Sequence, residues 1–216
     1  MATLMEHNSS ETVRLIEQAR RGDAAALNEL FTRHRDRLRR MVQMRLDWRL
    51  HGRIDASDVI QDAYLAAARR LDEYLRDPAM PLFLWLRFLV GEQMMILHRR
   101  HLGAKMRDAR REVSLYRHAL PEASSAALAA QLLGQQTSPS EAAIHAERML
   151  RLQAAVNRLD PLDREVLSLR HFEQLSRAET AQLLGIGEAA AAKRYIRALK
   201  RLKDTLADMP GGLEGL

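Results

Sequence analysis

The chain has 216 residues, of which 47% are hydrophobic, 29% are charged and only 5% are aromatic. This length suits one large or two small domains with packed cores. Cysteine is absent, which excludes a disulfide framework, a thiol nucleophile and a cysteine-ligated metal cluster. The net charge of +6 favours a polyanionic partner. Few segments alternate with period two, so an all-α fold is expected.

Two features of the sequence bear on where the protein acts. The N-terminus lacks a basic stretch followed by an apolar run, so we expect no signal peptide. The most apolar segment, residues 81–97, is interrupted by Arg87, Glu92 and Gln93 and is too short and too polar to span a bilayer. We therefore expect a cytoplasmic protein.

Helical periodicity organises the N-terminal half of the chain. Residues 1–10 are predicted to be a disordered tail, and residues 11–20 a short helix. Asp23 and Asp55 are expected to cap the next two helices. The first of these has an apolar face of Leu27, Leu30, Phe31, Leu38, Met41 and Val42. The second has a stripe of Val59, Ile60, Ala63, Tyr64, Ala67 and Leu71.

A loop, a fourth helix and a change of composition follow. Asp77-Pro78 and Met80-Pro81 predict a loop over residues 74–81. The fourth helix is expected to face a core through Leu82, Trp85, Leu86, Leu89, Val90, Met94 and Leu97. Between residues 113 and 137 the chain is rich in Ala, Ser, Gln and Leu, which predicts a linker with a transient helix over residues 123–133.

The C-terminal half begins with two strongly capped helices. Ser138, Pro139 and Glu141 fit the N-cap, N1 and N3 positions of the first helix, and Asp160-Pro161 fits the start of the second. The first helix is expected to carry the apolar residues Ile144, Leu150, Leu152, Val156 and Leu159. The second is expected to carry Leu162, Val166, Leu169 and Phe172.

A helix, a glycine turn and a basic helix then occupy residues 175–206. Ser176 and Glu179 fit a capping box, and Gly185 stands where a left-handed residue ends a helix. The second helix is expected to bury Ala191, Tyr195, Ala198, Leu199, Leu202 and Leu206. Its other faces carry Lys193, Arg194, Arg197, Lys200, Arg201 and Lys203. The pattern is typical of a DNA-binding helix–turn–helix, and an ordinary helical hairpin with a solvated basic face is the alternative.

Two ordered sets of segments lie on this chain. The N-terminal set comprises residues 22–31, residues 55–65, Phe83-Leu84-Trp85-Leu86 and Arg99-Arg100. The C-terminal set comprises residues 159–167, 175–187 and 197–202. Together they resemble regions two and four of the extracytoplasmic-function sigma factors of bacterial RNA polymerase. The chain has no room for the extra domain that larger housekeeping sigma factors carry between these regions.

The resemblance implies two small helical domains joined by a flexible linker. Region two would occupy residues 11–112, the linker 113–137, region four with its helix–turn–helix 138–209, and a tail 210–216. It also implies a non-enzymatic sigma factor without a cofactor. Such a factor binds the clamp helices and flap of core RNA polymerase, recognises a bipartite promoter and promotes its melting. An anti-sigma factor is a further candidate partner, and a stand-alone helix–turn–helix transcriptional regulator is the alternative function.

An acidic face on the third helix is the expected polymerase-binding site. Asp55, Asp58 and Asp62 lie three and four residues apart on one helical face, beside Gln61. They could ligate magnesium in a metal-dependent enzyme, act as caps and a solvated surface, or pair with a basic partner as the resemblance implies. No second carboxylate motif occurs on a partner helix, so we favour the polymerase contact over a metal site.

The loop over residues 74–81 stands where the family captures a base flipped out of the promoter. A flipped base needs a shaped pocket, which Tyr74, Asp77 and Met80 could line, although the two prolines could simply make the connection rigid. Trp85 is expected to be a core anchor rather than a base-stacking platform. The residues expected to contact the melted strand farther along are Arg87, Gln93, His98, Arg99, Arg100 and Lys105.

The chain departs from the family's pattern at one residue and in one short segment. Glu92 replaces a polar residue, often asparagine, and an acid there repels phosphate but can accept from the amino group of cytosine. Four alanines, residues 189–192, occupy the leading end of the recognition helix, so we expect more phosphate and shape readout than hydrogen bonds to bases. The residues expected to face duplex DNA are Arg177, Glu188, Lys193, Arg194, Arg197 and Lys200.

Overall fold

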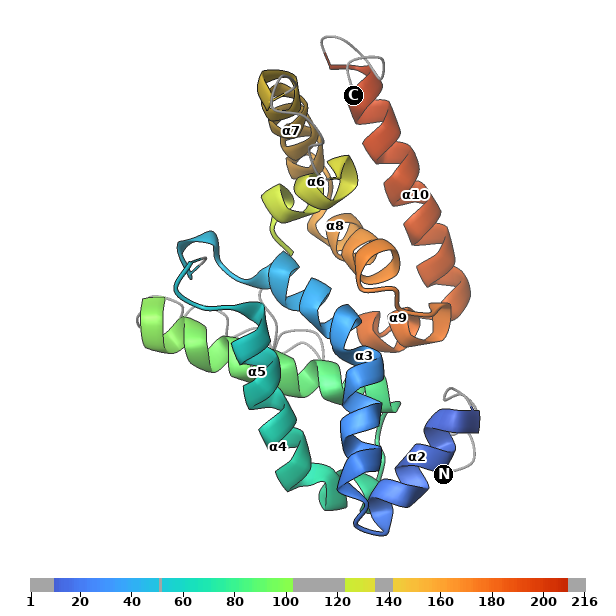
Figure 1. Ribbon diagram of the computed structural model, residues 1–216. Coiled ribbons are helices and arrows are strands. Elements are labelled where there is room, and N and C mark those ends of the chain that lie inside the picture. The colour runs from blue at the N-terminus through green and yellow to red at the C-terminus, as the bar shows by residue number, and fades with distance from the viewer. Residues whose placement is uncertain (1–9, 51, 103–122, 135–141, 210–216) are drawn as a thin grey trace. The chain divides into compact units, whose positions relative to one another are not determined.

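The computed structural model describes residues 10–50, 52–102, 123–134 and 142–209. Over these ranges the chain forms helices joined by short turns, without strands, so the expected all-α fold is confirmed (Figure 1). None of the described helices is long and apolar enough to cross a membrane. The predicted N-terminal tail, residues 1–10, ends one residue too late, because Ser10 already belongs to a helix. The predictions for residues 1–9, for the C-terminal tail, for Lys105 and for the Ser138 cap lie outside the described residues.

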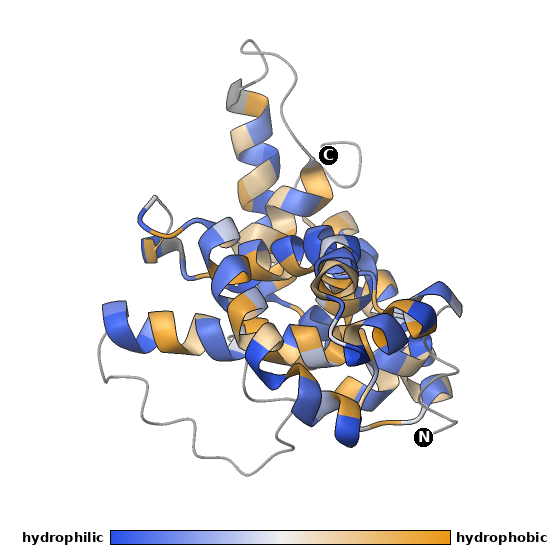
Figure 2. Cartoon of the chain, turned by 60° about the horizontal axis from the view of Figure 1, so that its bottom comes forward, coloured by the Kyte–Doolittle hydropathy of each residue, from blue (hydrophilic) through white to orange (hydrophobic). Residues whose placement is uncertain are grey.

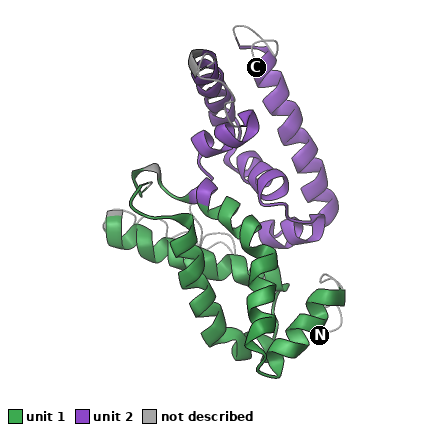
Figure 3. Cartoon of the chain, in the orientation of Figure 1, with its two compact units in different colours: residues 1–42, 46–121 green, residues 43–45, 122–216 purple. Residues whose placement is uncertain are grey.

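The chain divides into two compact units (Figure 3). Unit 1 comprises residues 1–42 and 46–121, and unit 2 comprises residues 43–45 and 122–216. In both units, hydrophobic and hydrophilic residues alternate within the helical turns (Figure 2). This alternation is the pattern of helices that bury one side against a core.

In its described residues, unit 1 contains four α-helices and a short 3-10 helix. They are α2 (Ser10–Arg20), α3 (Ala24–Arg45), η1 (Trp48–Leu50), α4 (Ala56–Arg76) and α5 (Leu82–Leu102). The predicted caps are confirmed, because Asp23 accepts from Ala25 N–H at 2.9 Å and Asp55 accepts from Ser57 N–H at 2.6 Å. These side chains satisfy amide groups that have no partner inside the helix, and so fix where α3 and α4 begin.

The predicted apolar stripes of α3, α4 and α5 form the core of unit 1. The helices α4 and α5 pack against each other. Tyr64 and Leu97 are only half-buried. The predicted loop over residues 74–81 is too long, because α4 continues to Arg76 and its C-cap is Asp77. Trp85 is buried, as expected of a core anchor.

Over residues 123–134 and 142–209, unit 2 contains five α-helices and a π-helical turn. They are α6 (Ser125–Leu133), α7 (Ala142–Asn157), α8 (Pro161–Leu167), η4 (Ser168–Phe172), α9 (Arg177–Leu184) and α10 (Glu188–Ala207). The helix α6 lies within the predicted linker, is capped by Ser124 and packs against α7. The predicted cap at Asp160 is confirmed by its bond from Leu162 N–H at 2.8 Å. The helix α10 packs against α7, α8 and α9.

Three residues of unit 2 expected in the core are exposed instead. They are Ile144 and Leu150 on α7 and Leu199 on α10. The helix α7 buries Leu152, Ala155 and Val156, so its buried side is narrower and nearer its C-terminal end than the apolar pattern suggests. Tyr195 is half-buried.

Candidate nucleic-acid interface

The turn between α9 and α10 is built by the predicted capping residues. Glu179 N–H donates to Ser176 Oγ at 3.1 Å, and Ser176 N–H donates to Glu179 Oε2 at 2.7 Å, which is a reciprocal capping box. Gly185 has φ 64° and ψ 35°, the left-handed conformation that a side chain disfavours. The helix–turn–helix geometry predicted from the sequence is therefore present.

The helix α10 separates its buried and basic sides. Ala191, Ala198, Leu202 and Leu206 are its buried stripe. The exposed cations Lys193, Arg197 and Lys200 recur at helical spacing on other faces. Glu188 is exposed in the first turn of α10, and Arg177 is exposed as the first residue of α9. Five of the six residues expected to face duplex DNA are thus accessible, and Arg194 differs from them.

Arg194 is half-buried and bound to a buried acid. Its Nη1 donates to Asp163 Oδ1 at 3.1 Å, and the other carboxylate oxygen of Asp163 pairs with Arg201. Asp163 is only 1% exposed, so this pair ties α10 to α8. Arg194 therefore has a structural role within unit 2, in addition to the DNA contact expected from the sequence.

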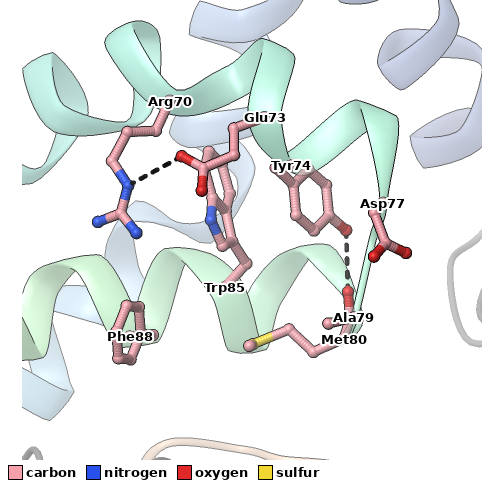
Figure 4. A pocket seen from close by; sticks show the side chains of 8 residues that line it. All are labelled: Arg70, Glu73, Tyr74, Asp77, Ala79, Met80, Trp85 and Phe88. Carbon is pink, nitrogen blue, oxygen red and sulfur yellow. Dashed lines mark hydrogen bonds and ion pairs between the residues drawn. The ribbon is translucent and has the colours of Figure 1, made fainter.

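A pocket of about 290 Å³ lies where α4 meets α5 in unit 1 (Figure 4). It brings together the three predicted pocket residues Tyr74, Asp77 and Met80. The ring of Tyr74 stacks on Trp85 with centroids 4.5 Å apart, and its hydroxyl donates to the Met80 carbonyl at 3.0 Å. Burial raises the pKa of the Tyr74 phenol, which keeps the hydroxyl protonated as a donor.

The rest of the pocket lining was not predicted from the sequence. Arg70, Glu73 and Phe88 line it together with Ala79 and Trp85. Arg70 Nη1 lies 2.6 Å from Glu92 Oε2 and its guanidinium lies 5.9 Å from the centre of the Phe88 ring. The acid at position 92 is thus paired within unit 1. The spacing of Arg70 and Glu73 on one turn of α4 is the signal that could have indicated these residues.

The fourth helix places its predicted strand-contacting residues in two different environments. Gln93 is half-buried, and Arg99 and Arg100 are exposed. Arg87 and His98 are 2% and 3% exposed, so they cannot reach a strand of DNA in this structure. Both are corrected from DNA contacts to core residues, because their side chains lie on buried sides of α5.

His98 has a defined role inside unit 1. The backbone N–H of Asp47 donates to His98 Nε2 at 3.4 Å, so this nitrogen acts as an acceptor. Burial lowers the pKa of His98, opposed by the nearby charge of Asp47. The hydrogen bond from Arg49 lowers the pKa of Asp47 to about 2, so this acid stays ionised.

The acidic face of α4 is exposed. Asp55, Asp58, Gln61 and Asp62 are all accessible to a partner. The backbone N–H of Ser57 lowers the pKa of Asp55 by stabilising its charged form. In the part of the chain that the structure describes, no three His, Cys, Asp or Glu side chains form a group that could hold a metal ion.

Comparison with known proteins adds to this geometry. Residues 149–202 match the family model described as Sigma-70, region 4. The matched segment runs from the second half of α7 into α10. The chain is 24% identical over 206 residues to the ECF RNA polymerase sigma factor BldN of Streptomyces coelicolor, covering 94% of this chain and 69% of BldN. It is 29% identical to the ECF RNA polymerase sigma factor SigD of Mycobacterium tuberculosis, covering 89% of this chain and 82% of SigD.

A solved structure shares the fold. The structure of CnrH in complex with the cytosolic domain of CnrY matches with a TM-score of 0.54 and 24% identity, over 93% of this chain and 100% of that chain. The family match and the helix–turn–helix assign residues 149–202 to sigma-70 region 4. Along most of its length the chain is similar to the extracytoplasmic-function sigma factors BldN and SigD, in agreement with the resemblance seen in its sequence.

Proposed function

We propose that the protein binds core RNA polymerase, recognises a bipartite promoter and promotes its melting. The single observation that carries the proposal is the capped helix–turn–helix whose second helix exposes Lys193, Arg197 and Lys200, inside the segment that matches sigma region 4. A helix with exposed cations suits the major groove of duplex DNA, because the cations neutralise phosphates on either side.

Unit 1 supplies the surface proposed to melt DNA. The pocket between α4 and α5 offers the aromatic rings of Trp85 and Phe88 and the carboxylates of Glu73 and Asp77. Aromatic surface compensates a flipped base for lost stacking, and carboxylates accept hydrogen bonds from base amino groups. Pockets that hold drug-sized ligands span about 300–1,000 Å³. A pocket of about 290 Å³ therefore suits a ligand of the size of one nucleobase.

The exposed acids of α4 are proposed to bind the polymerase. Asp58 and Asp62 lie one helical turn apart and point away from the α4 stripe that is buried. Two like charges on one turn are unfavourable in an isolated helix, so a basic partner would relieve their repulsion. A basic surface such as that of the clamp helices is the proposed partner, and an anti-sigma factor that competes for the chain is the further proposed partner.

In vitro transcription tests the proposal directly. The full chain is added to core polymerase on a library of promoter templates, and transcripts are sequenced. We expect initiation from a defined template class, and we expect the double variant Asp58→Ala, Asp62→Ala to lose it together with core binding. The matched control Asp204→Ala removes an exposed acid from α10 and should keep core binding.

Two outcomes would count against the proposed function. If no template gives transcripts and the chain fails to retain core polymerase in a pull-down, the chain does not act as a sigma factor. If the chain alone binds one duplex tightly in a gel shift and core polymerase adds nothing, a stand-alone regulator is the better description.

A further inference from the structure

Two large apolar side chains of α10 are exposed, and Ile196 is more exposed than Leu199, which is 38% exposed. Ile196 is 65% exposed, although isoleucine is usually among the most buried residue types. It lies three residues after Lys193 and four residues before Lys200, both of which are exposed. The core of unit 2 does not account for Ile196, because the buried stripe of α10 runs through other positions.

Helical geometry places Ile196 on the side of α10 that faces away from the core. Ala189, Lys193, Ile196 and Lys200 follow the spacing four, three and four along the chain. With 3.6 residues per turn, these four positions fall within about 60° of one another. The buried residues Ala191, Ala198 and Leu202 lie on the opposite side. The four positions therefore form one exposed strip, which we call the outer strip.

The chemistry of the outer strip fits a DNA groove. Its two lysines can reach phosphates, and the small side chain of Ala189 lets the leading end of the helix approach the base edges closely. The major-groove edges of the bases carry one apolar group, the C5-methyl of thymine. An isoleucine held between two phosphate-binding lysines is therefore positioned to meet that methyl group.

We propose that Ile196 reads thymine methyl groups in the major groove of the upstream promoter element. This inference rests on the proposed function, in which α10 binds duplex DNA. The alternative is that the exposed Ile196 contacts a protein partner. The centres of protein interfaces are depleted of charge, whereas Ile196 is flanked by two lysines on its own strip, which favours DNA.

The test compares thymine with uracil, which lacks only the methyl group. Promoter duplexes are first selected from a randomised library by the holoenzyme containing the full chain. The selected upstream element is then made with thymidine or with deoxyuridine, and binding of both probes is measured. We expect the natural protein to prefer the thymine probe by about fourfold for each methyl group contacted. The variant Ile196→Ala no longer contacts these methyl groups, so it should bind the thymine probe and the uracil probe with equal affinity.

A matched control separates this effect from a general loss of apolar surface. Leu150 is 68% exposed on α7, and Leu150→Ala should keep the thymine preference of the natural protein. Because Ile196 is largely exposed, Ile196→Ala should unfold at the same temperature as the natural protein, which thermal melting checks.

The outcomes distinguish the inference from the proposed function. If the holoenzyme selects no DNA, the proposed function fails and the inference fails with it. If it selects an element without thymine, or if Ile196→Ala keeps the full preference for thymine, the role of Ile196 is overturned while the proposed function stands. If Ile196→Ala loses core polymerase binding, Ile196 contacts protein and the inference is again overturned.

Discussion

The carboxylate of Asp163 accepts a hydrogen bond from the guanidinium of Arg194, with 3.1 Å between Oδ1 and Nη1. Asp163 lies in the first turn of α8, and Arg194 lies on α10. A buried carboxylate is costly unless it is paired, and Asp163 is paired with Arg194 and Arg201. The orientation of α10 on its supporting helix is thus set by charge as well as by apolar packing.

Replacing Asp163 with asparagine should destabilise unit 2. The change removes the negative charge from two hydrogen bonds, and bonds to charged groups contribute about 1.5–3 kcal/mol each. Asparagine keeps a neutral acceptor, and a neutral hydrogen bond still contributes about 0.5–1.5 kcal/mol. Since both arginines also keep some contact with water, we expect a net loss of about 1–2 kcal/mol. The free energy of unfolding measured in urea checks this value.

A double-mutant cycle isolates the pair. Asp163→Asn, Arg194→Ala and the double variant are compared by the same urea measurement. We expect the double variant to lose less stability than the sum of the two single variants. If the loss of stability in the double variant equals the sum of the two single losses, a direct interaction between the two side chains is contradicted.

Replacing Lys200 with alanine should weaken DNA binding by the same factor on every sequence. A lysine that neutralises one phosphate contributes about 0.9 to the slope of log K against log salt concentration. Binding of a selected duplex by the holoenzyme, followed by fluorescence anisotropy at increasing potassium chloride, measures that slope. We expect the slope to become shallower by about 0.9 for Lys200→Ala. The exposed Arg158, which lies outside α10, provides the control Arg158→Ala, with no change expected.

Replacing Tyr74 with phenylalanine should loosen the pocket of unit 1 without disturbing its ring. The change removes the hydrogen bond to the Met80 carbonyl, worth about 0.5–1.5 kcal/mol, and keeps the stacking on Trp85. We expect lower stability and slower promoter opening, followed by the permanganate reactivity of unpaired thymines. Tyr64→Phe alters a half-buried tyrosine that does not line the pocket and should open promoters at the normal rate. Equal rates for both variants would argue against a role of the pocket in melting.

Acidification should destabilise the protein partly through His98. Burial lowers the pKa of His98 in the folded chain, so the unfolded chain takes up the proton first as the pH falls below the ordinary value of 6.5. The stability contributed by neutral His98 is therefore complete above pH 6.5 and is lost as the pH falls toward the folded-state pKa. Urea midpoints at pH 7.5 and 5.5 should differ less for His98→Gln than for the natural protein. An equal difference in both proteins would assign the pH dependence to other groups.

The caps and the turn could be predicted from the sequence because they depend on neighbouring residues. Asp23, Asp55 and the pair Ser176 and Glu179 bond to amide groups within three residues of themselves. Gly185 follows the last periodic residue of its helix. Local preference and final structure agree at each of these places, which is usual for natural sequences.

The burial of charged residues could not be predicted in the same way. Residues 81–87 are all buried, so the beginning of α5 has no exposed side. Helical periodicity separates a buried side from an exposed side, so it gives no signal in this stretch. Arg87 lies in this stretch, and basic character alone suggested a surface position. Lys193 and Arg194 are neighbours in the sequence, yet Arg194 is bound by an acid 31 residues away. Contacts between distant segments decide these cases.

The pair formed by Arg70 and Glu92 constrains how these two positions can change during evolution. Ion pairs at partly exposed sites add little stability, so folding alone places little restriction on them. Charge balance beside a surface proposed to hold phosphates is a stronger restriction, because an unpaired acid at position 92 would repel the strand. We expect position 70 to be basic in the relatives whose position 92 is acidic, whereas asparagine at position 92 places no such restriction on position 70.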